Sequence, residues 1–349
     1  MNKRKYTIRF LLSFLFFAGF GNTAGAVPGK TAWAGTYNLA RWNIPSGDYS
    51  GITALGNGLY AVVNDKQNAF VLWRIRQDSL TGKVLQVEQV RRVVLQDCGD
   101  CLRLDLEAVS WWPEKNCLLL ASEQEQVIRG YDLSGRPLHD SWTLDGEASP
   151  QQIHANYGFE SLTADTANAC IWTCTENVLR TDGDPAGFFR RESVLLPVYR
   201  LNTEGGHRLA GRYRTDKPQA RSAGRTYCFG VSEMLSLPDY GLLVLEREFF
   251  VSKNYLRSWV NHKIYRVDPQ SLLEAEGGEV EKTLVVSFRT RLNPFSYSLA
   301  NYEGMAAGIR LPDGRQTVLL LCDAQSGAGN RLFHLKDYLR VLVLPSVTE

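Results

Sequence analysis

Eight acidic side chains recur in a fixed relation to short apolar segments, and they are the residues of this chain best suited to chemistry. Three glutamates each begin a polar, small, apolar pattern, and five carboxylates each end an apolar run. The first group is Glu107, Glu160 and Glu303, with Ser50 and Ser232 at equivalent places, and the second is Asp65, Glu123, Glu176, Glu246 and Asp323. Oxygen ligands without His or Cys at metal spacing favour Ca²⁺, or Mg²⁺ and Mn²⁺, over zinc.

A turn between two apolar runs joins each pair of polar positions, which is typical of a β-hairpin. In the last copy the hairpin runs from Tyr302 through the turn Pro312-Asp313-Gly314 to Asp323. The first and last residues of an antiparallel hairpin are neighbours, so each copy brings its polar pair to the same edge. The five copies therefore predict a ring of carboxylates at one rim of the molecule.

The elements that position this ring are short strands. After each acidic position comes an apolar, aromatic and basic segment, as in residues 198–201 and 332–335, and a fourth apolar stretch usually follows. Four strands per unit with almost no helical periodicity predict an all-β fold, a β-propeller of five to six four-stranded blades. Residues 33–49 and 340–344 either close the ring or form a degenerate sixth blade. A β-sandwich is the competing architecture, but it does not explain why the polar pair recurs in register.

A ring of carboxylates needs a source of positive charge. Two carboxylates about 5 Å apart repel by roughly 3 kcal/mol at an effective dielectric constant near 20. A bound cation or raised pKa values relieve this repulsion, unless the carboxylates lie farther apart or accept enough backbone N–H bonds. We expect Ca²⁺, with Mg²⁺ or Mn²⁺ as alternatives. Two insertions, residues 177–197 and 247–263, should overhang the same rim with cations for an anionic ligand: Arg180, Arg190, Arg191, Arg247, Lys253, Arg257 and His262.

The N-terminal residues 1–26 have the pattern of a secretory signal: four basic residues, an apolar run at 10–20 and Ala24-Gly25-Ala26 as a cleavage site. The apolar run is too short to span a bilayer, although a retained anchor is the alternative. We expect a periplasmic or extracellular monomer in which residues 27–349 form one domain. Removal of the signal takes the formal charge from +2 to 2 − 4 = −2, so neither a nucleic acid nor an anionic membrane is an expected partner.

The other reactive residues give weaker signals. Cys98 and Cys101 could close a small disulfide loop, but seven cysteines are an odd number, and Cys170 and Cys174 are better explained as buried thiols. The chain has no Gly-x-Ser-x-Gly nucleophile motif, no phosphate-binding glycine loop and no dinucleotide fingerprint. A serine esterase triad is therefore not expected.

Several motifs resemble one known family in the same order along the chain. They are Asn156-Tyr-Gly-Phe-Glu160-Ser-Leu, then Gly230-Val-Ser-Glu-Met-Leu with Gly241-Leu-Leu-Val-Leu-Glu246-Arg247, and then Asn301-Tyr-Glu303-Gly-Met-Ala with Leu311-Pro-Asp-Gly-Arg315. Over about residues 48–335 the chain resembles the exported bacterial family called esterase-like activity of phytase. The resemblance implies a propeller related to the β-propeller phytases, whose members use bound Ca²⁺ to neutralise and position phosphate.

The resemblance also implies counterparts of the family's acidic signature, which are Asp105, Glu107, Glu123, Asn156, Glu160, Glu176, Glu246, Arg247, Asn301 and Glu303. Two features depart from the family pattern. Ala108 and Ser161 stand where Gly usually follows the glutamate, and the chain has no run of Asp and Lys like that of a true phytase's calcium cluster. These departures argue against phytate itself as the substrate.

We therefore expect a metal-dependent hydrolase that acts on a phosphate ester or another small anionic ester. Glu160 and Glu303 are the candidate catalytic carboxylates, and Arg247 is the candidate binder of the substrate anion. The expected metal ligands are Asp105, Glu107, Glu123, Glu160, Glu176, Glu246, Asn301 and Glu303. A lactonase is the second enzymatic reading, and a non-catalytic ligand- or protein-binding propeller with a structural Ca²⁺ is the alternative from another class.

Overall fold

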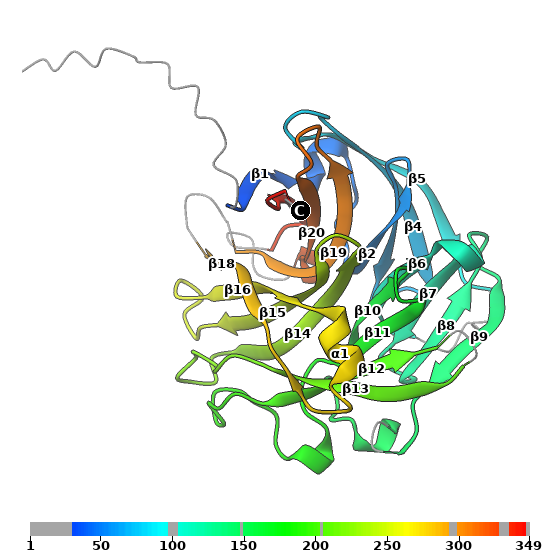
Figure 1. The fold of residues 1–349 in the computed structure, drawn as a ribbon. Coiled ribbons are helices and arrows are strands. Elements are labelled where there is room, and N and C mark those ends of the chain that lie inside the picture. Colours follow the sequence, from blue (N-terminus) through cyan, green and yellow to red (C-terminus); the bar gives the residue numbers. More distant parts are fainter. Residues whose placement is uncertain are drawn as a thin grey trace, which may run out of the picture.

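The structure, a computed structural model, describes residues 30–96, 104–146, 149–202, 205–292, 299–327 and 335–346. These residues form five β-sheets arranged as the blades of a propeller (Figure 1). The all-β prediction is confirmed with five blades, and a sixth blade is not supported. The expected signal at residues 1–26 and the expected disulfide between Cys98 and Cys101 lie outside the described residues.

Each blade has a core of four antiparallel strands, and β-strands 2 to 16 follow the chain order. The first blade contains β2 (Tyr49–Gly56), β3 (Leu59–Asn64), β4 (Ala69–Gln77) and β5 (Val84–Val94). The second blade contains β6 (Leu106–Trp112), β7 (Cys117–Ser122), β8 (Val127–Tyr131) and β9 (Pro137–Thr143). The third blade contains β10 (Phe159–Asp165), β11 (Cys170–Thr175), β12 (Leu195–Leu201) and β13 (His207–Arg214), with β17 (Glu279–Val280) added in parallel.

The fourth blade contains β14 (Thr226–Leu237), β15 (Gly241–Val251), β16 (Trp259–Val267) and β18 (Thr283–Arg291), with the short helix α1 (Pro269–Glu274) after β16. The fifth blade joins both ends of the chain. Its strands β19 (Asn301–Arg310), β20 (Gln316–Asp323) and β21 (Tyr338–Val343) pair in order, and β1 (Ala32–Asn38) pairs with β21. The N-terminal strand therefore closes the ring. The strand paired with β20 is β21, and of the residues 332–335 that the sequence favoured there, 332–334 lie outside the described residues.

The insertion at residues 247–263 is mostly strand, where the sequence indicated a loop. The β15–β16 ladder continues to the pair Phe250 and Trp259, so only residues 252–258 make the turn. The fourth blade consequently extends past the end of the ring.

The described residues contain no helix with the length and apolar character needed to cross a bilayer.

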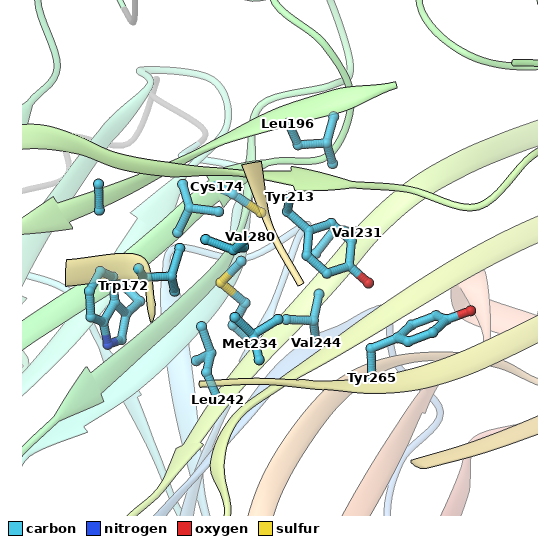
Figure 2. Close-up of a cluster of buried hydrophobic side chains, with 14 of the residues drawn as sticks. Trp172, Cys174, Leu196, Tyr213, Val231, Met234, Leu242, Val244, Tyr265 and Val280 are labelled. Carbon is cyan, nitrogen blue, oxygen red and sulfur yellow. The ribbon is translucent and has the colours of Figure 1, made fainter. Parts of the chain in front are cut away.

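The core lies between adjacent blades rather than within one layer. Figure 2 shows the cluster between the third and fourth blades, where Trp172, Met234 and Val244 meet from β11, β14 and β15. All six residues of β7 and all eight of β20 are buried, because these sheets are covered on both faces. Apolar surface buried in this way stabilises the fold by roughly 25 cal/mol per Å², so the packed blades hold the rim rigidly.

The innermost strands β2, β6, β10, β14 and β19 contact one another in a closed ring around the axis. Their backbones approach closely, as where the Val231 N–H donates to the carbonyl of Glu176 across 3.0 Å. A Cβ atom at Gly230 would lie 2.0 Å from that carbonyl oxygen, so only glycine fits there. The sequence Gly230-Val231 therefore sets how tightly the third and fourth blades join at the rim.

Candidate functional site

Each innermost strand carries a β-bulge at an equivalent place, which is near the first residue of every strand except the longer β14. The pairing register skips one residue between Tyr49 and Gly51 in β2, and it does the same in the four other innermost strands. The skipped residues are Ser50, Glu107, Glu160, Ser232 and Glu303. A bulge redirects a side chain and often lies beside an active site. The five positions singled out from the sequence are therefore structurally equivalent.

The second polar position of each hairpin lies opposite the residue two places before the bulge. The backbone N–H groups of Asp65, Glu123 and Glu176 donate to the carbonyls of Asp48, Asp105 and Gly158 across 3.1, 2.8 and 2.9 Å. Asp323 pairs with Asn301 in the fifth blade. In the fourth blade the residue at this position is Arg247, which pairs with Gly230. Comparison of the five copies in the sequence placed Glu246 at this position, so the prediction is wrong by one residue in this blade.

Arg247 is the centre of a buried ion-pair network that joins three blades. Its Nη1 donates to Glu303 and its Nη2 donates to Glu176, and Nη2 also lies 3.4 Å from Glu160 Oε2. The Arg247 side chain is 5% exposed and Glu176 is fully buried. Three carboxylates in contact with one guanidinium leave this group little capacity for a further anion. The geometry therefore favours Arg247 as a counter-ion of the ring.

The opposite part of the ring is a cluster of carboxylates from the first two blades. Asp65, Asp105 and Glu107 each offer a carboxylate oxygen, and the three oxygens lie within 4.8 Å of one another. Lys66 contributes positive charge at the edge, because its Nζ lies 2.9 Å from Asp48 and 3.1 Å from Asp65. This convergence of hard oxygen donors is suited to a divalent cation.

Six of the ring carboxyl groups have raised pKa values. Burial raises the pKa of Glu107 well above its usual range, and the charges of Glu303, Glu123, Asp65 and Asp105 raise it further. Burial likewise raises the pKa of Glu160 well above normal, although the Arg247 charge opposes that rise. The pKa values of Asp65, Glu123, Glu303 and Asp323 are also raised, chiefly by burial. Without added positive charge, the ring therefore resists full ionisation.

The charges of the ring do not balance. Among the residues that the structure describes, nine carboxylates belong to it, which are Asp48, Asp65, Asp105, Glu107, Glu123, Glu160, Glu176, Glu303 and Asp323, against the two cations Lys66 and Arg247. Two buried oxygen atoms of the ring, Glu176 Oε2 and Asn301 Oδ1, have no hydrogen-bond partner in the described part of the chain. Buried polar atoms normally have a partner. Oxygen-only donors, unpartnered acceptors and excess negative charge fit a bound cation.

Two of the predicted ligands make hydrogen bonds at the ring, one between two blades and one within the fifth blade. Glu123 Oε1 accepts from the Gly158 N–H across 3.0 Å, and the Asn301 side-chain amide donates to Glu303 Oε1 across 2.8 Å. Both residues belong to the ring, as the sequence predicted. Asn156 instead occupies an exposed turn with a φ of 60°, which supports a conformational role for it.

Glu246 lies apart from the ring, between the third and fourth blades. It accepts hydrogen bonds from Tyr213 Oη across 2.7 Å, from the Asp216 N–H across 3.1 Å and from Lys282. Figure 2 shows the Tyr213 ring beside Val231 and Val244 of the fourth blade. Adjacent residues of a strand face opposite sides, and since Arg247 faces the ring, Glu246 faces this network instead.

Most of the insertion cations do not contact ring carboxylates in the described part of the chain. Arg180 donates to the Ile153 carbonyl, Arg190 donates to the Asp184 carbonyl, and Arg191, Lys253 and Arg257 are exposed. His262 is buried in β16, where its Nε2 accepts from the Tyr302 N–H across 3.0 Å. Of the seven cations, Arg247 is the one that the structure brings into contact with ring carboxylates among the described residues.

Residues that the sequence did not assign to the site also lie in it. Asp65 and Asp323 ended apolar runs but were not among the expected ligands, and Asp48 stands two residues before Ser50 as Asp105 does before Glu107. Comparison of the five copies already placed Asp65 and Asp323 at the rim, and the matching positions of Asp48 and Asp105 would have added Asp48. Cys228 has no such signal, yet its thiol donates to Glu176 Oε1 across 2.8 Å and lies 3.3 Å from Arg247 Nη2.

Solved structures of similar shape include propellers with unrelated titles. "Luciferin-regenerating enzyme" has a TM-score of 0.43 at 10% identity, with 88% of this chain and 94% of that chain covered. "Streptogramin B lyase structure" has a TM-score of 0.37 at 12% identity, with 89% and 98% covered. "Kuenenia stuttgartiensis Hydrazine Synthase" has a TM-score of 0.37 at 11% identity, with 80% of this chain covered but only 58% of that chain.

Sequence comparison gives a more specific result. A search of curated proteins finds no match. The family model described as "Phytase-like: Esterase-like activity of phytase" matches residues 44–324, which include all five bulges and the whole ring.

Proposed function

Since the chain belongs to the esterase-like activity of phytase family, we propose that it is a metal-dependent hydrolase of a phosphate ester or another small anionic ester, with its site at the carboxylate ring. The observation that carries this proposal is the convergence of Asp65, Asp105 and Glu107 in a ring with nine carboxylates and two cations. An anionic ester would be repelled by such a ring alone, so a cation must accompany it.

The donor set favours Ca²⁺, with Mg²⁺ or Mn²⁺ as alternatives, because every converging ligand atom is an oxygen. Asp65, Asp105 and Glu107 would hold the ion. A divalent cation there supplies positive charge beside the ester anion and lowers the pKa of a bound water. In this proposal the ester is bound next to that triad.

Glu160 and Glu303 remain the proposed catalytic carboxylates. Each is 15% exposed, and each is held in place by Arg247. A carboxylate held beside the bound ester can accept a proton from an attacking water. Arg247 acts in this proposal by fixing both carboxylates, a positioning role, whereas the sequence suggested that it would bind the substrate anion.

The remaining parts of the proposal follow from the sequence. We propose that residues 1–26 direct export, that residues 27–349 act as a single monomeric domain, and that the protein works in the periplasm or outside the cell. The basic start, the apolar run and the small-residue cleavage site support export.

The test is turnover by chelator-stripped protein of a panel of phosphomonoesters, carboxyl esters and lactones, with and without Ca²⁺, Mg²⁺ or Mn²⁺. Glu160→Gln and Glu303→Gln should each abolish metal-dependent turnover. The matched control is Glu279→Gln. Glu279 lies on the outer strand β17 and forms an ion pair with Arg214 of β13, so this substitution should leave turnover unchanged. Equal activity in all three variants would place the chemistry elsewhere.

A non-catalytic propeller with a structural cation is the second candidate. The observation that favours it is the engagement of Arg247 with three ring carboxylates, which makes that part of the ring a closed network. If Ca²⁺ raises the melting temperature while every substrate class stays unhydrolysed, this second candidate replaces the first.

A further inference from the structure

The tip of the fourth blade is a separate surface with a composition unlike that of the ring. Here the tip means residues 186–193, 217–227, 250–259 and 287–292. Between Arg247 at the ring and Val251 at its end, β15 continues for four residues, about 13 Å at strand spacing. Because β14 and β16 pair with this extension, the tip is a firm projection beyond the ring (Figure 1).

Aromatic side chains form a continuous band across the tip. Phe188 packs on Phe189 with ring centroids 3.8 Å apart and on Tyr227 at 5.6 Å. Tyr227 lies directly opposite Phe250 in the ladder, and Phe250 packs on Trp259 at 5.4 Å. This band extends from the insertion of the third blade to the end of the fourth, so the two loops form one surface.

Three apolar side chains of the tip are exposed. Phe189 is 92% exposed, Leu256 is 55% exposed and Tyr255 is 36% exposed. All three lie in turns or loops at the ends of the band, where a side chain can insert into a binding partner without unfolding a strand. Large apolar groups exposed on one aromatic band indicate an interaction surface.

The tip is also strongly basic. Its residues include nine cations, which are Arg190, Arg191, Lys217, Arg221, Arg225, Lys253, Arg257, Arg289 and Arg291, and one acid, Glu192. The local formal charge is therefore 9 − 1 = +8, although the chain without residues 1–26 has a charge of −2. Two of the cations lie over aromatic rings, Arg225 at 4.7 Å from Tyr255 and Arg289 at 4.5 Å from Trp259.

We propose that this tip docks on the surface of an anionic phospholipid bilayer, with Phe189, Tyr255 and Leu256 entering the headgroup region and the surrounding cations contacting lipid phosphates. Charge complementarity supports the lipid, because basic segments with exposed aromatic and aliphatic side chains bind anionic membrane surfaces. The projecting shape and the aliphatic Leu256 favour a bilayer over a nucleic acid, whose bases would stack on flat aromatic faces.

This inference goes beyond the proposed function and does not depend on it. Docking through the tip would hold the carboxylate ring close to the lipid surface, since the tip extends from the ring's own strands. The net charge of the chain argued against an anionic membrane partner, but that value averages the acidic ring with the basic tip. Local charge, rather than net charge, decides such an encounter.

The test is sedimentation of the purified exported protein with vesicles of phosphatidylcholine alone or with about one third phosphatidylglycerol, at low and high salt. We expect binding to the anionic vesicles, weakened by salt because surface charges are screened. Arg191→Gln with Arg257→Gln should weaken binding about 30-fold, at about fivefold per cation near an anionic surface. Phe189→Ser with Leu256→Ser should weaken it about tenfold, with an unchanged melting temperature.

Matched controls come from the first two blades. Leu80 is 70% exposed in the turn before β5, and Arg74 and Arg136 are exposed cations away from the tip, so Leu80→Ser and Arg74→Gln with Arg136→Gln should bind like the unchanged protein. Equal weakening by the controls, or no binding to anionic vesicles at low salt, would overturn the proposal. Tighter binding to single-stranded DNA than to vesicles would also overturn it. Binding to neutral vesicles that tip variants do not weaken would reveal a retained leader and overturn docking by the tip.

Discussion

Replacement of Arg247 by Met should be among the most destabilising changes on the rim of this protein. The guanidinium contacts Glu160, Glu176 and Glu303 and is 5% exposed, so its loss leaves buried negative charge without a partner. Removal of one member of a buried ion pair typically costs about 3 to 5 kcal/mol. At roughly 2 °C per kcal/mol for a domain of this size, the melting temperature should fall by about 6 to 10 °C.

The assay is unfolding by guanidinium chloride, followed by tryptophan fluorescence. It is run in the presence of a chelator at pH values from 4 to 8. The pKa values of Glu160 and Glu303 are raised in the folded protein, so these groups keep protons that the unfolded chain loses. Stability is therefore highest below their ordinary pKa and falls as pH rises through the folded pKa. Without Arg247 this fall should be steeper, so the variant should be close to the unchanged protein near pH 4 and far below it at pH 8.

Lys66→Met is the matched control, because Lys66 also pairs with two ring carboxylates but is 46% exposed. Exposed ion pairs contribute about 1 kcal/mol or less, so this variant should lose little stability. A loss for Arg247→Met no larger than that for Lys66→Met, or a loss independent of pH, would refute the view that Arg247 offsets the charge of the ring.

Three further predictions concern other buried charges. Glu107→Gln should abolish the rise in melting temperature that added Ca²⁺ gives, whereas Glu279→Gln on the outer strand should keep it, as thermal scans with and without Ca²⁺ will show. Glu233 is 1% exposed and burial raises its pKa well above normal, so Glu233→Gln should remove a loss of stability with rising pH, measured by urea unfolding between pH 5 and 9. Lys282→Met should cost about 1.5 to 3 kcal/mol at pH 7 because Lys282 donates to Asp216. Burial opposes ionisation of Asp216, but its hydrogen bonds lower the pKa to about 2, so the cost should shrink as pH falls from 4 toward 2 in acid unfolding.

The sequence predicted the ring because a hairpin places its first and last residues side by side in any fold. Glu107, Glu160 and Glu303 were recognisable as equivalent positions, and each proved to be a bulge residue of an innermost strand. The bulges themselves could not be predicted from the sequence. A bulge depends on how two strands pair, and the same residue types occur in strands without one.

The fourth blade shows why register could not be predicted. Glu246 and Arg247 are adjacent and both polar, so charge alone favoured the glutamate as the end of the apolar run. The pairing of Gly230 with Arg247 reverses that choice, and a shift of one residue exchanges the two faces of a strand. The basic tip of the same blade was not predicted either, because the sequence gives the net charge of the chain and not the distribution of charge in space.

The most direct test of the central claim, that the ring binds a divalent cation, is calorimetric titration of Ca²⁺ into chelator-stripped protein alongside the variant Asp105→Asn. The convergence of Asp65, Asp105 and Glu107 predicts saturable heat of binding in the unchanged protein and at least a tenfold weaker affinity in the variant. An absence of heat for Ca²⁺, Mg²⁺ and Mn²⁺ alike, or equal affinity in both proteins, would contradict a cation site at the ring.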